Sequence, residues 1–167
     1  MSSLTATDQD YLQTAIELSR RALNEQGKTP FGAILVLDGE IVSEGMSSVI
    51  ELFDPSAHAE VMALRNGARK LKRHLLTGSV LYSSSEPCPM CLTACYWAQI
   101  ARVVFGATTY DVATYGFEDL QLYRELATGI GQRSLPEVSA DEPLREQAAD
   151  VLRNWAENFP EPVTPKY

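Results

Sequence analysis

Two short segments, about thirty residues apart, most restrict what this chain can fold into. The first is His58-Ala59-Glu60 and the second is Pro87-Cys88-Pro89-Met90-Cys91. Two thiolates and one imidazole suit zinc, and three protein ligands leave the fourth tetrahedral position open for water, as in catalytic sites. We therefore expect a fold that brings His58, Cys88 and Cys91 together around one Zn²⁺.

The spacing within each segment is typical of a helix N-terminus. Cys88 and Cys91 are three residues apart, so one helical turn places both sulfur atoms on the same side, and the helix dipole there favours thiolate. His58 and Glu60 are two residues apart, so both reach one metal only if their helix presents its N-terminal end. We expect two helix N-termini to converge on the zinc, with Glu60 as proton carrier and not as ligand.

Other functions remain open for the cysteines. Three cysteines within eight positions do not make a disulfide framework. A Cys-x-x-Cys pair alone also occurs in redox proteins, although such pairs usually follow a thioredoxin-like strand and lack an upstream His-x-Glu. A structural zinc site would need a fourth ligand. Cys95, one turn after Cys91, could supply it in principle, but we favour a buried apolar position for Cys95.

Composition and charge restrict the partners. A chain of 167 residues with 45% hydrophobic residues suits a single domain over residues 1–167. A formal net charge of −8 argues against a nucleic acid as partner, because phosphate contacts need a basic face. No apolar run approaches the roughly 20 residues of a membrane helix, and the N-terminal residues lack a secretory pattern. We expect a cytoplasmic protein with a small substrate and no membrane partner.

Hydrophobic periodicity predicts alternating helices and strands. Helices are expected at residues 8–26, 58–72, 88–99, 120–126 and 144–158. Strands are expected at residues 31–37, 40–46, 79–83 and 102–107, with a fifth strand within residues 129–139. Asp38-Gly39 favours a hairpin between the first two strands, whereas strand–helix–strand units are parallel. The predicted fold class is α/β, with a mixed sheet and helices on its faces in three layers.

With these segments in place, the sequence resembles the zinc-dependent cytidine deaminase superfamily. His58-x-Glu60 followed by Pro87-Cys88-x-x-Cys91 is a known signature of nucleobase deaminases. Further stretches are similar to the bacterial guanine deaminase branch, namely residues 30–33, 54–61, 85–92, 96–98 and 116–119 together with Lys166-Tyr167. The resemblance covers nearly the whole chain. It implies a three-layer α/β/α sandwich around a five-stranded mixed sheet.

The resemblance also implies roles for single residues. His58, Cys88 and Cys91 match the metal ligands, and Glu60 matches the proton shuttle. A second catalytic acid is implied at Asp119, which would hold or protonate the base. Substrate contacts are implied for Phe31, Ser47, Ala59, Trp97, Phe117 and Tyr167. In that family the terminal tyrosine comes from a domain-swapped partner, so the tail at residues 160–167 is expected to close an active site in a homodimer.

Some of these positions have structural alternatives, and one departs from the family. Trp97 and Phe117 could be core aromatics, and Asp119 could cap a helix. Ser47 stands where the family usually has an asparagine, whose amide offers a donor and an acceptor in place of one hydroxyl. The difference bears on which base is bound and leaves the reaction type unaffected.

The function that these observations favour is zinc-dependent hydrolytic deamination of a free purine. Guanine, converted to xanthine and ammonia, is the expected substrate, with one Zn²⁺ per subunit. The same chemistry on cytosine, a pterin-like or triazine ring, or a nucleoside remains open. A tRNA adenosine deaminase and a non-catalytic zinc-binding module are the remaining alternatives.

Overall fold

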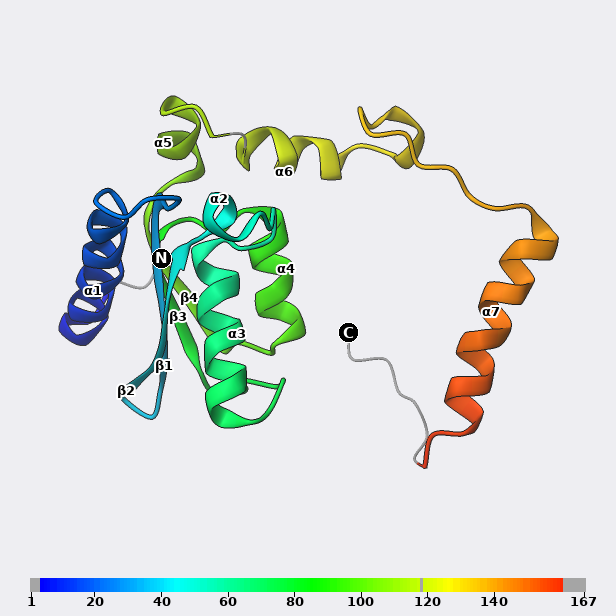
Figure 1. The fold of residues 1–167 in the computed structure, drawn as a ribbon, viewed down its shortest axis with the longest axis horizontal. Coiled ribbons are helices and arrows are strands. Elements are labelled where there is room, and N and C mark those ends of the chain that lie inside the picture. Colours follow the sequence, from blue (N-terminus) through cyan, green and yellow to red (C-terminus); the bar gives the residue numbers. More distant parts are fainter. Residues whose placement is uncertain (1–3, 118, 161–167) are drawn as a thin grey trace. The chain divides into compact units, whose positions relative to one another are not determined.

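The computed structural model describes residues 4–117 and 119–160, and its contacts divide the chain into two compact units. Unit 1, Met1–Ala127, contains the sheet and the helices α1 to α6, and unit 2, Thr128–Tyr167, contains η1 and α7 (Figure 1). The expectation of a single domain stays a prediction. Among the described residues, no helix has the length and apolar character needed to cross a bilayer.

Unit 1 is built on a mixed sheet with the strand order β2-β1-β3-β4. β1 (Thr29–Leu37) pairs antiparallel with both β2 (Glu40–Ser47) and β3 (Val80–Ser85), whereas β3 pairs parallel with β4 (Arg102–Ala107). Asp38 and Gly39, between β1 and β2, both have positive φ, as the tight hairpin turn requires. The predicted hairpin and the predicted parallel pair are therefore both confirmed.

The fifth strand predicted within residues 129–139 is wrong. These residues form the short 3-10 helix η1 (Ile130–Gln132) followed by bends and irregular backbone, so the described sheet has four strands. The segment contains two glycines and a proline, residue types that are depleted in strands. Its apolar side chains Leu135 and Val138 are 73% and 92% exposed, so no buried face stabilises an extended conformation here.

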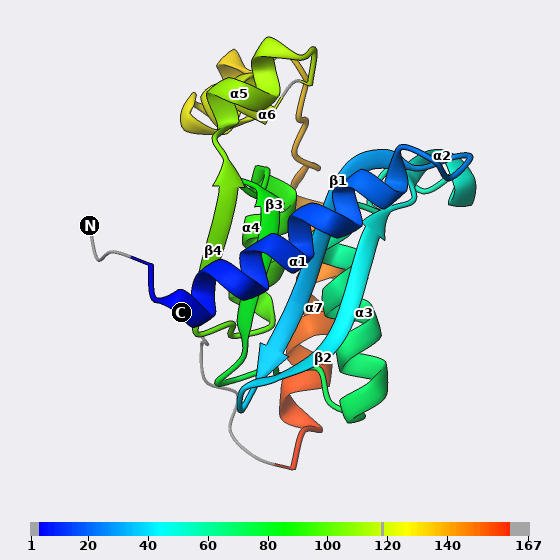
Figure 2. The same cartoon turned by 90° about the vertical axis from the view of Figure 1, so that its left-hand side faces the viewer.

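Helices cover both faces of the sheet. On β1, Ile34 and Val36 belong to a core cluster with Ala15 and Leu18 of α1 (Ala6–Ala22). The alternating residues of β1 point to the opposite face, where Leu35 packs with side chains of α3 (Ala59–Leu71) and α4 (Pro89–Trp97). Figures 1 and 2 show α1 on one side of the sheet and α3 and α4 on the other.

The helix boundaries show where local capping differs from the sequence prediction. α1 begins at Ala6, two residues before the predicted start, because Thr5 and Asp8 form a capping box. Asp8 also accepts hydrogen bonds from Tyr82 and Arg102. Arg102 and Tyr82 hold the pKa of the Asp8 carboxyl well below its usual range, so this carboxylate fixes the start of α1 against β3 and β4.

Two short helices were not predicted from the sequence. α2 (Val49–Leu52) follows β2, and α5 (Thr109–Thr114) follows β4. A capping box of Thr108 and Asp111 begins α5. α6 (Asp119–Ala127) follows α5 in unit 1, and α7 (Glu142–Glu157) is the long helix of unit 2, both close to their predicted positions.

Candidate active site

The three predicted metal ligands meet where two helices begin. His58 is the N-cap residue of α3 and Cys88 that of α4, and Cys91 lies in the first turn of α4. The Sγ atom of Cys88 lies 3.6 Å from Nδ1 of His58 and 3.6 Å from Sγ of Cys91, and the donor atoms all lie within 4.8 Å of one another. All three cysteines of the chain are free thiols. Two sulfur atoms and one imidazole at this spacing fit the donor set of zinc.

A close approach of β2 to α3 fixes the position of His58. A Cβ atom added at Gly45 would lie 2.1 Å from the Ala59 carbonyl oxygen, so only glycine permits this contact. The Ser48 amide donates to the Ala57 carbonyl at 2.8 Å, which attaches the chain before His58 to the end of β2. The start of α3 is therefore held by backbone contacts on both sides of the ligand.

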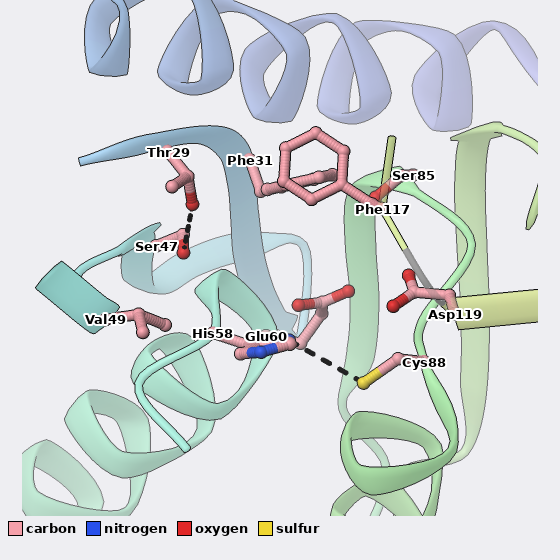
Figure 3. Close-up of a pocket in the computed structure, with 10 residues that line it drawn as sticks. All are labelled: Thr29, Phe31, Ser47, Val49, His58, Glu60, Ser85, Cys88, Phe117 and Asp119. Atoms are coloured by element: carbon pink, nitrogen blue, oxygen red, sulfur yellow. Dashed lines mark hydrogen bonds between the residues drawn. The ribbon is translucent and has the colours of Figure 1, made fainter. Parts of the chain in front are cut away.

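Glu60 is the buried carboxyl beside the three ligands. Only 4% of the residue is exposed, and the Ser83 hydroxyl donates to Glu60 Oε1 at 3.2 Å. Burial raises the pKa of the Glu60 carboxyl, which favours its protonated form. Figure 3 shows this carboxyl projecting into the cavity above His58. A carboxyl that takes up a proton easily next to a metal site is suited to transfer protons.

The electrostatics of the cluster favour a thiolate at Cys88. The neighbouring Cys91 thiol, at hydrogen-bond distance, and then His58 lower the pKa of the Cys88 thiol to about 4 against the effect of burial. The hydrogen-bond contact between His58 and Cys88 in turn raises the pKa of the His58 imidazole. The hydrogen bond to Cys88 and burial raise the pKa of Cys91. Because cysteine binds metal as thiolate, a bound cation would displace the proton that Cys91 retains.

A cavity of about 200 Å³ opens above the cluster (Figure 3). Its lining consists of Thr29, Phe31, Ser47, Val49, His58, Glu60, Ser85, Cys88, Phe117 and Asp119. The rings of Phe31 and Phe117 meet edge to face, with centroids 4.8 Å apart and an interplanar angle of 81°. Asp119, at the start of α6, points its carboxyl into the cavity, and burial raises the pKa of this group. Within the described residues, its carboxyl has no hydrogen-bond partner.

The predicted site residues do not all lie at the cavity. Phe31, Ser47, Phe117 and Asp119 line it, whereas Ala59 is fully buried in the core between α3 and the sheet. Trp97 ends α4 with 61% of its surface exposed, so it is neither a core residue nor part of the lining. Tyr167 lies outside the described residues.

Cys95 does not join the ligand cluster. It lies in the core with Leu81 and Ala98, and burial raises the pKa of its thiol to about 12. The described group of metal-ligating side chains comprises His58, Cys88 and Cys91 alone. Among the described residues no fourth side chain joins this group, which agrees with the catalytic interpretation better than with a structural zinc site.

Sequence reasoning missed three lining residues, Thr29, Val49 and Ser85. The Thr29 hydroxyl donates to the Ser47 hydroxyl at 2.6 Å, so these two residues form one polar wall. Ser85 is only 5% exposed, and its hydroxyl has no hydrogen bond to any described residue. For Ser85, the sequence did contain an indication. Ser83 and Ser85 follow Leu81 at every second position on the buried face of β3, where hydroxyl groups replace apolar side chains.

Comparisons with known proteins agree with this geometry. Residues 5–107 match the family described as the cytidine and deoxycytidylate deaminase zinc-binding region. Guanine deaminase of Bacillus subtilis is 40% identical over 126 residues, which cover 75% of this chain and 81% of that protein. A tRNA-specific adenosine deaminase of Haemophilus influenzae is 38% identical over 130 residues, covering 74% and 75%. The X-ray structure of the Bacillus subtilis guanine deaminase superposes with a TM-score of 0.85 at 35% identity, covering 96% of this chain and all of that one.

Proposed function

Because the chain belongs to the zinc-binding family of cytidine and deoxycytidylate deaminases and is a hydrolytic deaminase, we propose that it converts guanine and water to xanthine and ammonia. The observation that carries the proposal is the buried carboxyl of Glu60 beside His58, Cys88 and Cys91 at the base of a small cavity. The proposed metal content is one Zn²⁺ per subunit. The similarity to a guanine deaminase over almost the whole chain supports guanine as the base.

In the proposed reaction, His58, Cys88 and Cys91 bind the metal and Glu60 transfers protons. Zinc held by His58, Cys88 and Cys91 would supply a water whose pKa is lowered towards neutrality. Glu60 takes a proton from this water and delivers it to the ring nitrogen next to the carbon that bears the exocyclic amine. A bond forms between the water oxygen and that carbon. Glu60 then takes the proton of the new hydroxyl group and passes it to the exocyclic amine. The carbon–nitrogen bond breaks as that oxygen becomes the carbonyl of xanthine, and ammonia leaves.

The cavity walls favour a flat ring with a polar edge. Phe31 and Phe117 supply the aromatic surface against which a base can pack. Asp119 offers a half-buried carboxyl that no described residue engages, and it would accept a hydrogen bond from a ring N–H of the base. The hydroxyls of Thr29 and Ser47 form the cavity wall on the β1–β2 side (Figure 3), where they would face a bound base.

Adenosine in tRNA is the second candidate substrate, because tRNA-specific deaminases are nearly as similar in sequence. The net charge of −8 opposes it, since binding of a polyanion relies on Lys and Arg. Of the basic side chains on α3, Arg65 is already paired with Asp54 at 3.1 Å. A small neutral base therefore fits this chain better than a tRNA arm.

The active form is proposed to be a homodimer in which the tail at residues 160–167 closes a partner's site. Of this tail, only Pro160 lies within the described residues. Within unit 2, the apolar side chains of Val151, Leu152 and Trp155 on α7 are largely exposed, which supports the proposal. Apolar side chains on a helix usually pack against another element, and a second copy of the chain would provide it.

One assay tests the proposed function. The purified protein is incubated with guanine, adenine, cytosine, guanosine and a tRNA anticodon arm, and ammonia release is measured alongside zinc content. We expect turnover with guanine at one zinc per subunit. Faster turnover of cytosine, or inosine formation in the tRNA arm without guanine turnover, would replace the proposed substrate. No ammonia from any of them at full zinc occupancy would contradict guanine deamination and favour a non-catalytic module.

A further inference from the structure

Two hydrogen-bonded contacts attach α5 and α6 to the segment just before the ligand Cys88. The Glu86 carboxylate accepts hydrogen bonds from the backbone amide of Thr109, at 2.8 Å, and from its hydroxyl. The Tyr123 hydroxyl of α6 donates to the Pro87 carbonyl oxygen at 2.7 Å. Glu86 and Pro87 are consecutive, so both short helices are fastened to the backbone next to the metal ligand.

Tyr123 and Asp119 lie on one face of the same helix. They are four residues apart in α6, which places their side chains one turn apart on the same side. Asp119 points into the cavity, and Tyr123 reaches the Pro87 carbonyl one turn later. Whatever fixes Tyr123 therefore also fixes the height and the rotation at which α6 presents Asp119.

Core packing does little to hold this helix in place. α6 has no buried residue, in contrast to α3, which has six. Tyr123 itself is half-buried, and burial together with the charge of Glu86 raises the pKa of its phenol to about 12, so it remains a hydrogen-bond donor at neutral pH. A single directed hydrogen bond has more influence on a weakly packed helix than on one locked into the core.

We propose that Tyr123 is a positioning residue, which holds Asp119 at the correct place over the base by fastening α6 to the Pro87 carbonyl. Tyr123 is not among the residues that line the cavity, nor among the described metal-ligating group. The inference rests on the proposed function only in that Asp119 contacts the base. It assigns the hydrogen bond a role in the rate of the reaction, whereas a merely structural role would be confined to stability.

The first test is Tyr123→Phe, which removes the hydroxyl and keeps the ring. We expect kcat with guanine to fall about 10-fold, while the zinc content and the visible spectrum of the cobalt-substituted enzyme stay at wild-type values. Tyr110→Phe, on the exposed surface of α5, is the matched control and should leave all three unchanged. Wild-type kcat in Tyr123→Phe would overturn the proposal. A changed cobalt spectrum would also overturn it, because Tyr123 would then act on the metal ligands.

The second test asks whether Tyr123 acts through Asp119. If it does, Tyr123→Phe should slow the wild-type enzyme but add little to the loss already caused by Asp119→Asn, so the two effects on kcat are not additive. Additive losses in the double variant would overturn the proposal. The singles, the double variant and the wild type are compared under identical conditions, with urea unfolding to confirm that each is folded.

A third measurement separates this inference from the proposed substrate. Amide hydrogen exchange in residues 119–127 should be several-fold faster in Tyr123→Phe than in the wild type, while exchange in α3 stays unchanged. This readout needs no substrate, so it remains decisive if the wild-type enzyme fails to deaminate guanine. Unchanged exchange in α6 would overturn the proposal even in an enzyme that is active on guanine.

Discussion

The floor of the cavity and its cover are built in opposite ways. The floor comprises His58, Glu60, Cys88 and Cys91, on the first turns of two helices that pack on the sheet. The cover is residues 108–117 and 119–127, which carry α5, α6, Phe117 and Asp119. Ala59, Ala63 and Leu64 of α3 belong to the main core cluster, whereas α6 has no fully buried residue. The floor is thus part of the core, and the cover lies over it with few buried contacts.

This difference suggests that one region determines the type of reaction and the other determines which base is bound. In the proposed function, the floor holds the groups that would bind the metal and the carboxyl of Glu60, and the start of α3 is fixed by backbone contacts such as that at Gly45. The cover and the wall of Thr29 and Ser47 hold groups that are proposed to contact the base. We therefore expect changes in the floor to remove activity on every base, and changes in the cover or wall to alter rates selectively.

The largest effect is expected for Cys91→Ser in the floor. Replacement of the soft thiolate by a hydroxyl removes one of three ligands, so zinc content and ammonia release should both fall to background on every base. Metal analysis and the base panel check this outcome. Cys95→Ser is the matched control, because it changes a core thiol outside the cluster, and it should keep zinc. Retained activity in Cys91→Ser would mean that the floor does not bind the catalytic metal.

Glu60→Gln should have the next largest effect. The amide matches the carboxyl in shape but cannot carry a proton, so kcat should fall by about 10⁴-fold on every base. The zinc content should equal that of the wild type, because Glu60 is not among the metal-ligating group. Single-turnover rates and metal analysis check both points. A loss confined to one base would place Glu60 in substrate selection and break the proposed division.

The parts of the fold that the sequence predicted correctly depend on local signals. The Asp38-Gly39 pair specified the hairpin, and the prolines at its start indicated α4. The ligand cluster followed from the chemistry of His58, Cys88 and Cys91, because three such donors have few other arrangements. The start of α1 differed by two residues because Thr5 and Thr7 are equally plausible caps until the partner Asp8 is placed.

What the sequence could not predict depends on contacts between distant segments. A fifth strand needs a neighbouring strand to pair with as well as apolar residues. Residues 129–139 have apolar residues but pair with no strand of the described sheet. The exposure of Trp97 depends on which elements surround it, and so does the lack of a hydrogen-bond partner for the Ser85 hydroxyl among the described residues. The attachment of Tyr123 to Pro87 spans 36 residues, and nothing in either local sequence indicates it.

Asp119→Asn, in the cover, should have a smaller effect that differs between bases. The amide keeps the shape but loses the charge that accepts a hydrogen bond from the base, so kcat/KM for guanine should fall about 10²-fold. Bases that lack a ring N–H at that edge should be affected less. Steady-state kinetics over the base panel measure the ratio. An equal loss on all bases would place Asp119 functionally with the floor and would remove the distinction between the two regions.

Ser47→Asn, in the wall, is expected to have the smallest effect and the only gain. The amide adds a donor and an acceptor where one hydroxyl is now bonded to Thr29, so kcat/KM for guanine should rise about 5-fold, which corresponds to one net hydrogen bond. Ser48→Ala is the matched control, because this neighbouring hydroxyl accepts from Lys28 at 2.7 Å and lies outside the lining. A rise that is confined to guanine would show that the wall selects the base. A lower kcat/KM for guanine together with a higher kcat/KM for another base would identify the base that the Thr29–Ser47 wall of the wild type prefers. The comparison is direct because the floor is the same in the wild type and in Ser47→Asn.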